Sequence, residues 1–208
     1  MKKKELLKQL IAGFQAGLPV EVYPRELMLP VDSNKIITVP GVRRCGKSSL
    51  FLLVINQLIS EKGIRKEQIL FLNFDDERLQ FDAENFDEIL QAYRELYPDI
   101  SLKDVYMFFD EIQMAEDWQP FVHRVYEQEC RHIFITGSNS NMLSSELATS
   151  LRGRTLQYEE FPNANGSPYT FAPVISAIIG FLNPTYAIFF PPKFLPFHQS
   201  KHLPPLCL

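Results

Sequence analysis

The segment GVRRCGKS, residues 41 to 48, has the residue types and the spacing of a loop that binds phosphate groups. Its glycines, Gly41 and Gly46, let backbone N–H groups face phosphate oxygens, and the segment that follows is patterned as a helix, whose N-terminus favours an anion. Lys47 is expected to reach the β- and γ-phosphates of a nucleotide, and the Ser48 hydroxyl is expected to ligate Mg²⁺. The sequence therefore predicts a site for a nucleoside triphosphate with Mg²⁺.

The arginines and the cysteine of this loop occupy the positions that the pattern G-x-x-x-x-G-K-[ST] leaves unrestricted. At such positions the backbone makes the phosphate contacts and side chains can point away. The predicted nucleotide-binding residues are Gly41, Val42, Arg43, Arg44, Cys45, Gly46, Lys47, Ser48 and Ser49.

Two adjacent carboxylates, Asp110 and Glu111, follow the apolar and aromatic run VYMFF at residues 105–109. A carboxylate at the end of a neighbouring strand can hold Mg²⁺ directly or through water, which is the role expected of Asp110. Glu111 is placed to orient and polarise an attacking water. This pair favours hydrolysis over transfer of phosphate to a substrate; the alternative for Glu111 is a solvated charge at a strand end.

Three further polar residues are candidates for catalysis. Asn139 follows a predicted strand, where it can sense the γ-phosphate or align water, or simply belong to a turn or helix cap. Arg152 and Arg154, in the segment LRGR, can neutralise transition-state charge in the site of a neighbouring subunit. They can equally pair with Glu159 or Glu160.

Short apolar runs alternate with helix-patterned segments along the chain, which is typical of a parallel sheet covered on both faces. The predicted strands are 35–39, 69–74, 105–109 and 132–136, and the predicted helices are 48–59, one that starts with a capping-box-like pair at Asn85 and Glu88, one capped by Asp117, and 142–151. The predicted fold class is a three-layer α/β/α sandwich with a mainly parallel sheet.

The N-terminal segment, residues 1–29, is expected to contain an amphipathic helix rather than a signal peptide. Its apolar face comprises Leu6, Leu7, Leu10, Ile11 and Phe14. The net charge of −4 gives no overall basic footprint and therefore no clear nucleic-acid signal. The three scattered cysteines favour reduced thiols, and a cytoplasmic location is expected.

The composition changes at about residue 160, after the predicted 30–160 core. Residues 161–208 contain no Asp or Glu and hold nine of the chain's 15 prolines. One interpretation is a membrane span over residues 169–192, although prolines interrupt it. A second is a disordered or loosely associated tail. The preferred hypothesis is a non-native continuation, such as the product of a shifted reading frame after a truncated core.

An ordered set of segments carries a resemblance to a known family. The segments are ITVPGVRRCGKSSL, FFDEIQ with Trp118 shortly after it, ITGSNS, ELATSLRGR and EEFP. In these segments the chain resembles the bacterial and archaeal predicted ATPases of the AAA+ superfamily that have a GxRRxGK-type loop. The resemblance covers roughly residues 30–162. The paired arginines look like this family's form of the phosphate loop.

The resemblance implies a P-loop NTPase fold and ATP as the nucleotide. It also implies a charged, helical lid after residue 162 and a C-terminal domain of unknown function. The expected function is Mg²⁺-dependent ATP hydrolysis that drives a conformational change in a partner or a further domain, with a homo-oligomer formed through Arg152 or Arg154. The alternatives are a nucleotide-dependent switch with little turnover, a P-loop kinase, and an ATPase tethered to a membrane by its tail.

Overall fold

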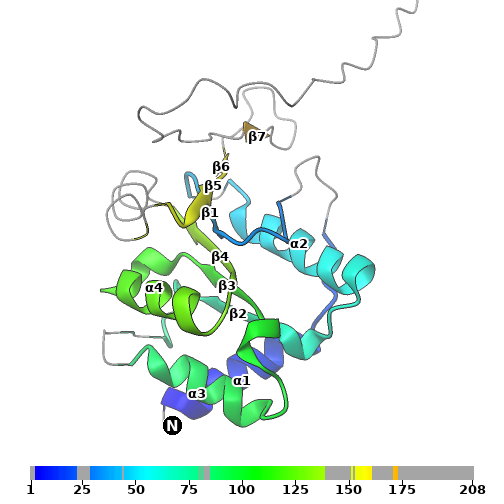
Figure 1. Ribbon diagram of the computed structural model, residues 1–208, viewed down its shortest axis with the longest axis vertical. Helices are drawn as coiled ribbons and strands as arrows, with labels where there is room; N and C mark the ends of the chain where they lie inside the picture. The colour runs from blue at the N-terminus through cyan, green and yellow to red at the C-terminus, as the bar shows by residue number, and fades with distance from the viewer. Residues whose placement is uncertain are drawn as a thin grey trace, which may run out of the picture. The chain divides into compact units, whose positions relative to one another are not determined.

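The structure of the chain is a computed structural model, shown in Figure 1, and it describes residues 3–22, 29–43, 45–79, 81, 85–138, 151, 153–160 and 171–172. All of these residues belong to one compact unit that ends at residue 176. Several predicted features lie outside the described residues: Arg44, Asn139, Arg152, the helix predicted from residue 142 and nearly all of the segment after residue 160.

A five-stranded parallel sheet forms the centre of the fold, with the order β2-β3-β4-β1-β5. Its strands are β1 (Ile36–Pro40), β2 (Ile69–Asn73), β3 (Tyr106–Asp110), β4 (His132–Gly137) and β5 (Thr155–Gln157). The first four confirm the predicted strands to within a residue at each end. The fifth was not predicted, because it is a half-buried segment of three residues without an apolar run.

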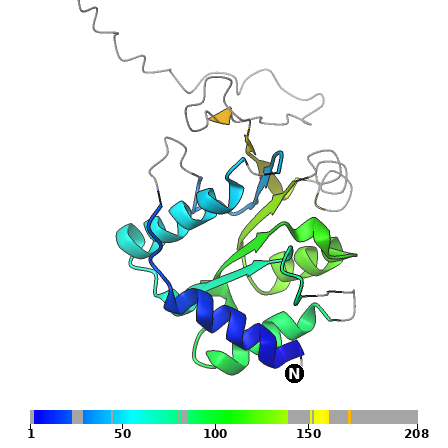
Figure 2. The same cartoon turned by 180° about the vertical axis from the view of Figure 1, so that it is seen from behind.

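Helices cover both faces of this sheet, which confirms the predicted sandwich. The α-helices are α1 (Lys3–Ala16), α2 (Lys47–Lys62), α3 (Asp87–Leu96) and α4 (Trp118–Gln128), and the 3-10 helices are η1 (Lys66–Gln68), η2 (Leu102–Asp104) and η3 (Ile112–Met114). Figures 1 and 2 show α2 on one side of the sheet and α4 on the other. The connections between successive strands from β1 to β4 therefore cross a face of the sheet, as parallel strands require.

Alternate residues of each strand face the two covering layers. In β3, Phe108 points to the α2 side, whereas Met107 and Phe109 belong to the core under α3 and α4. On the α2 side the ring of Phe51 packs edge-on against Phe108 and Phe134, with centroids 5.3 and 6.4 Å apart. Because both faces are buried, the strands are apolar throughout rather than alternating, and this pattern made them predictable.

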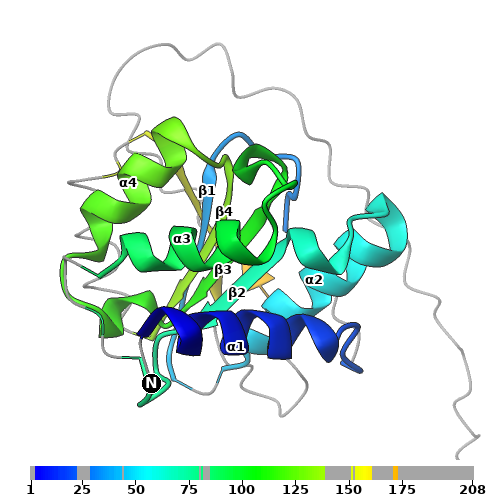
Figure 3. The ribbon, with the colours of Figure 1, turned by 90° about the horizontal axis from the view of Figure 1, so that it is seen from below.

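The helix α1 lies beside α3 and the edge strand β2 (Figure 3). The amide of Gln15 donates from Nε2 to the carbonyl of Ile69 at 2.7 Å and so satisfies a backbone acceptor at the outer side of the strand. Tyr97 in turn donates from its hydroxyl to Oε1 of Gln15. Thus the expected amphipathic helix also carries a buried polar side chain that covers the start of an otherwise open sheet edge.

Two helix starts differ from the predictions. The helix α3 begins at Asp87, with Phe86 rather than Asn85 at the N-cap position and without a side-chain cap there. Asp117 does stand at the N-cap position of α4, but in a left-handed conformation (φ 52°) and without a side-chain hydrogen bond to the helix. A buried aromatic residue lies at each helix start: Phe86 occupies the N-cap position of α3, and Trp118 is the first residue of α4.

Beyond the sheet, β6 (Glu159–Glu160) pairs antiparallel with β7 (Phe171–Ala172). Backbone pairing therefore continues past residue 160, and the domain boundary placed there from composition stays a prediction. Among the described residues, no helix combines the length and apolar character needed to cross a bilayer.

The substitution Phe51→Ala should lower the free energy of unfolding by about 3–5 kcal/mol, because it removes a fully buried ring that two sheet rings contact. Chemical denaturation of the parent and the variant measures this loss. The control is Leu52→Ala, which truncates the half-buried neighbour on the same helix. An equal loss in both variants would show that the Phe51 contact is not central to the core.

Candidate functional site

The phosphate loop connects the end of β1 to the start of α2, as predicted. Gly46 immediately before the helix has φ 99°, a conformation that glycine adopts without strain. At the other end of the loop, the N–H of Gly41 donates to the carbonyl of Gly137 at 3.1 Å, which ties the loop to the end of β4. Cys45 is buried and Ser49 is half-buried. The loop is thus anchored at both ends and bends tightly at Gly46.

Lys47, the first residue of α2, turns its side chain back into this loop. Its ammonium Nζ donates to the carbonyls of Gly41 and Val42 at 3.1 and 3.0 Å and lies 3.2 Å from Oε1 of Glu111. The residue is only 4% exposed. A buried ammonium needs a counter-charge, and Glu111 provides it in this structure.

Asp110, at the end of β3, is held by two hydroxyl groups. Ser48 donates from Oγ to Oδ2 at 2.6 Å, and Thr136 donates from Oγ1 to Oδ1 at 2.5 Å. The residue is 1% exposed, and this burial raises the pKa of the Asp110 carboxyl above its ordinary value, against the opposing effect of the two hydrogen bonds. The contact between Ser48 and Asp110 brings the two predicted metal ligands together.

Glu111 follows Asp110 in a left-handed conformation (φ 52°), which turns its side chain toward Lys47. Its Oε2 accepts hydrogen bonds from Nε2 of Gln113 at 2.7 Å and from the N–H of Ser138 at 2.9 Å. Burial raises the pKa of Glu111, but these hydrogen bonds and the nearby ammonium of Lys47 outweigh burial and leave the pKa below its ordinary value. The carboxylate is therefore ionised at neutral pH, as a group that polarises water must be.

Thr136 links the two carboxylate residues. Its hydroxyl donates to Asp110 and accepts from the N–H of Glu111 at 2.9 Å. The side chain is fully buried at the end of β4, which adjoins β3 in the sheet. Thr136 therefore fixes both the Asp110 carboxylate and the turn that presents Glu111.

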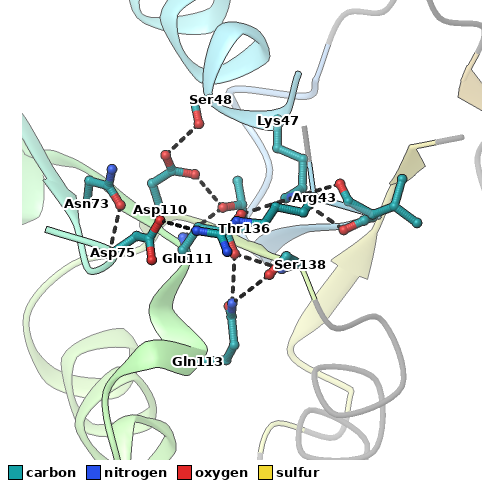
Figure 4. A network of polar contacts seen from close by, with 12 residues as sticks. Arg43, Lys47, Ser48, Asn73, Asp75, Asp110, Glu111, Gln113, Thr136 and Ser138 are labelled. Carbon is teal, nitrogen blue, oxygen red and sulfur yellow. Dashed lines mark hydrogen bonds and ion pairs between the residues drawn. The ribbon is translucent and has the colours of Figure 1, made fainter. Parts of the chain in front are cut away.

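A second cation of the loop, Arg43, reaches away from Lys47. Its Nη2 lies 2.9 Å from Oδ2 of Asp75, which comes shortly after β2, and the N–H of Asp75 donates to Oδ1 of Asn73 at 2.9 Å (Figure 4). Side chains from the ends of four neighbouring strands thus meet in one network.

Of the predicted arginines, Arg154 is described, and it lies next to β5 rather than in this network. Its Nε is 2.6 Å from Oε1 of Glu127 on α4. Its predicted role at the site of a neighbouring subunit, like the roles of Asn139 and Arg152 outside the described residues, stays a prediction.

Five members of the network were not among the predicted site residues: Asn73, Asp75, Gln113, Thr136 and Ser138. Each of these residues lies at the end of a predicted strand or shortly after it, so its position at the carboxyl edge of the sheet could be predicted from the sequence. Their side-chain partners could not be predicted, because those contacts depend on the strand order and on the conformation of the turns.

The side chains present fit a Mg²⁺ ion held together with a nucleotide. Within the described ranges no cluster of three His, Cys, Asp or Glu side chains forms a metal site by itself. Mg²⁺ at a phosphate-binding site needs only one or two protein oxygens, because phosphates and water supply the rest. The hydroxyl of Ser48 and the carboxylate of Asp110, already 2.6 Å apart, are such a pair of hard oxygen donors.

Comparison with known proteins gives matches of three kinds. A family model described as "AAA domain" matches residues 33–164. An uncharacterized protein of Haemophilus influenzae is 39% identical over 150 residues, which cover 71% of this chain and 36% of that protein. Uncharacterized protein MJ1544 of Methanocaldococcus jannaschii is 36% identical over 163 residues, which cover 77% of this chain and 34% of that protein. The solved structure of C. elegans PCH-2 aligns with 16% identity and a TM-score of 0.37, over 76% of this chain and 43% of that chain.

The chain spans about a third of the length of the two curated relatives it matches. The family model, in contrast, covers more than half of the chain and includes the phosphate loop, both carboxylates and Arg154. The resemblance drawn from the sequence is thereby confirmed: the chain belongs to the AAA domain family of the AAA+ superfamily.

Proposed function

We propose that this domain binds ATP with Mg²⁺ and hydrolyses it to ADP and phosphate. The observation that carries the proposal is the convergence of Lys47, Ser48, Asp110 and Glu111 at one edge of the sheet, through contacts of 2.6 and 3.2 Å. The family supports nucleotide binding, and the residues at the strand ends supply the groups that hydrolysis needs.

Binding of ATP changes the partner of Lys47. The ammonium lies beside the loop that receives the phosphates, and its counter-ion without nucleotide is the carboxylate of Glu111. A triphosphate carries more negative charge than one carboxylate and therefore attracts the ammonium more strongly. Lys47 then turns to the β- and γ-phosphates and releases Oε1 of Glu111.

The two oxygens of Glu111 have separate tasks in this proposal. Oε2 is held by Gln113 and by the N–H of Ser138, so the carboxylate keeps its orientation when Lys47 leaves. Oε1 becomes free to accept a proton from water. Loss of the nearby ammonium also removes one of the influences that lower the pKa of Glu111, so the carboxylate becomes a stronger base once ATP is bound.

The chemical step is an in-line displacement. The water oxygen bonds to the γ-phosphorus while Oε1 of Glu111 takes the water proton, and the bond from the γ-phosphorus to the bridging oxygen breaks to release ADP. Mg²⁺, when bound, neutralises charge on the β- and γ-phosphates. Ser48 and Asp110 would hold the ion there, and Thr136 keeps Asp110 in place.

Hydrolysis would be coupled to a conformational change in a partner or in a further domain of a longer protein, as in the predicted family role. A homo-oligomer through Arg152 or Arg154 is part of this proposal. The pair of Arg154 with Glu127 lies at the surface, and surface pairs contribute only about 0–1 kcal/mol, so a neighbouring subunit's nucleotide could replace Glu127 as its partner.

Lys47→Ala should weaken Mg-ATP binding at least about 100-fold, because it removes a charge-assisted contact to the phosphates from a buried position. Calorimetric titration of the full chain measures this change. The matched control is Lys62→Ala, which removes a lysine from the other end of the same helix. Binding by a folded Lys47→Ala variant at parental affinity would contradict the proposed phosphate site.

Glu111→Gln should keep ATP binding and lower the hydrolysis rate by about 10²–10⁴-fold, since the amide cannot accept the proton of water. Release of phosphate at saturating ATP measures the rate, with the exposed residue Glu116 changed to Gln as the control. Equal rates in parent and Glu111→Gln would remove Glu111 from catalysis. Tight binding without turnover in the parent would favour the nucleotide-dependent switch.

Asp110→Asn should raise the Mg²⁺ concentration needed for half-maximal ATP binding by about 10–100-fold, because it removes the charge of the proposed metal ligand and keeps its shape. Titration of Mg²⁺ at fixed ATP, with EDTA as the metal-free limit, gives this concentration. An unchanged Mg²⁺ dependence in a folded variant would mean that Asp110 has a structural role alone.

A further inference from the structure

The ion pair between Arg43 and Asp75 spans most of the site. Arg43 follows β1 and Asp75 follows β2, and in the sheet these two strands are separated by β4 and β3. Three strand spacings amount to about 14 Å. A contact of 2.9 Å between the two side chains therefore requires the loop after β1, the turn after β2 and both side chains together to bridge the ends of the two intervening strands.

The ends of those two strands carry the catalytic groups. Asn73 pairs with Asp110 in the sheet, and the N–H of Phe74 donates to the carbonyl of Asp110 at 2.9 Å, so the chain leading to Asp75 passes directly beside the proposed metal ligand. On the other side, Gly41 is hydrogen-bonded to Gly137, next to Ser138, which holds Glu111. Figure 4 shows Arg43 reaching across this edge to Asp75.

The same edge has to accommodate the γ-phosphate. Lys47, Asp110 and Glu111 lie where the end of the triphosphate would be bound in the proposed function, and Arg43 brings a second positive charge to the same edge of the sheet. Asp75 is the group that currently neutralises this charge. The arginine therefore belongs to the same edge of the sheet as the groups proposed to bind the γ-phosphate, the phosphate that distinguishes ATP from ADP.

The pair is weak enough to be exchanged. The side chain of Arg43 is 73% exposed and that of Asp75 is 38% exposed, and water screens a pair of this kind strongly. A phosphate group carries more charge and offers an arginine two parallel hydrogen bonds, so it competes well with a single carboxylate contact. Asp75 itself is restrained, because its N–H is bound to the side chain of Asn73.

We infer that Arg43 is the residue that distinguishes the triphosphate from the diphosphate, and that Asp75 positions Arg43 across the strand ends until the γ-phosphate replaces it. This inference rests on the proposed function. It assigns the first arginine of the loop to γ-phosphate binding and gives the exposed aspartate after β2 a part in nucleotide selectivity.

The test is a double-mutant cycle of Asp75→Asn, Arg43→Gln and the variant with both changes. For each full-length chain, calorimetry with Mg²⁺ gives the dissociation constants of a non-hydrolysable ATP analogue and of ADP, and the ratio of the two constants is the readout. The matched control is Asp76→Asn, which removes the same charge one residue later, where the partner is the local Arg78. A general loss of stability would change both nucleotides alike and leave the ratio unmoved.

Arg43→Gln should weaken binding of the analogue about tenfold or more relative to ADP, since a charged hydrogen bond to the γ-phosphate is lost. Asp75→Asn should tighten binding of the analogue about fivefold relative to ADP. This factor corresponds to the loss of one exposed ion pair, which contributes up to about 1 kcal/mol. In the Arg43→Gln background, Asp75→Asn should leave the ratio unchanged. Asp76→Asn should not move it in either background.

Two results would overturn the inference while leaving the proposed function intact. One is a ratio of the two dissociation constants that is the same in the parent and in all variants of Arg43 and Asp75, although Lys47→Ala weakens nucleotide binding. The other is an effect of Asp75→Asn on the ratio that persists without Arg43. If the folded parent binds neither the analogue nor ADP, the proposed function fails, and the inference fails with it.

Discussion

The site depends on the compensation of two buried charges, the Lys47 ammonium and the Asp110 carboxylate. Each is less than a twentieth exposed, and the other buried polar side chains of the described residues, Gln15, Thr38 and Thr136, are uncharged. An uncompensated buried charge would cost several kcal/mol, so each must have partners in place. Asp110 is satisfied by the hydroxyls of Ser48 and Thr136, and Lys47 is satisfied by two loop carbonyls and by Glu111. Through these partners the two charges fix the loop, the end of β4 and the turn after β3.

The parallel sheet makes this compensation possible, because it brings the carboxyl ends of its strands to one edge. β1 supplies the phosphate loop, β3 supplies both carboxylates, and β4 supplies Thr136 and then Ser138. β2, at the edge of the sheet, adds Asn73 and the turn to Asp75. The apolar core on the two faces holds the strands in register, so the positions of polar groups at their ends follow from packing far from the site.

Much of this arrangement could be predicted from the sequence, for a physical reason that differs between its parts. Strands buried on both faces leave continuous apolar runs, which is why β1 to β4 were predicted, whereas the short half-buried β5 left no such signal. Gly46, Lys47 and Ser48 were predictable because the chemistry of phosphate binding fixes their spacing. The bond from Gln113 to Glu111 was not, because it depends on the left-handed conformation of Glu111, which no propensity of glutamate predicts. The N-cap position predicted at Asn85 was wrong although a local pattern was present: the cap is the buried Phe86, one residue later.

The two described cations of the phosphate loop are both paired with carboxylates, and these pairs shape what ATP would do there. Lys47 is paired with Glu111 and Arg43 with Asp75, so each of these two cations is held by a carboxylate from a different strand end. The two pairs differ in burial, and a buried pair responds far more strongly to loss of its partner than an exposed one. Entry of phosphate therefore has unequal consequences. In the proposed function, removing Lys47 from Glu111 would change the basicity of the group proposed to act on water, whereas removing Arg43 from Asp75 would break one surface contact of the turn after β2, which Asn73 still holds. In this proposal one ligand would alter the chemistry of the buried pair and the side-chain contact of the exposed pair, because the two pairs lie at the same edge of the sheet.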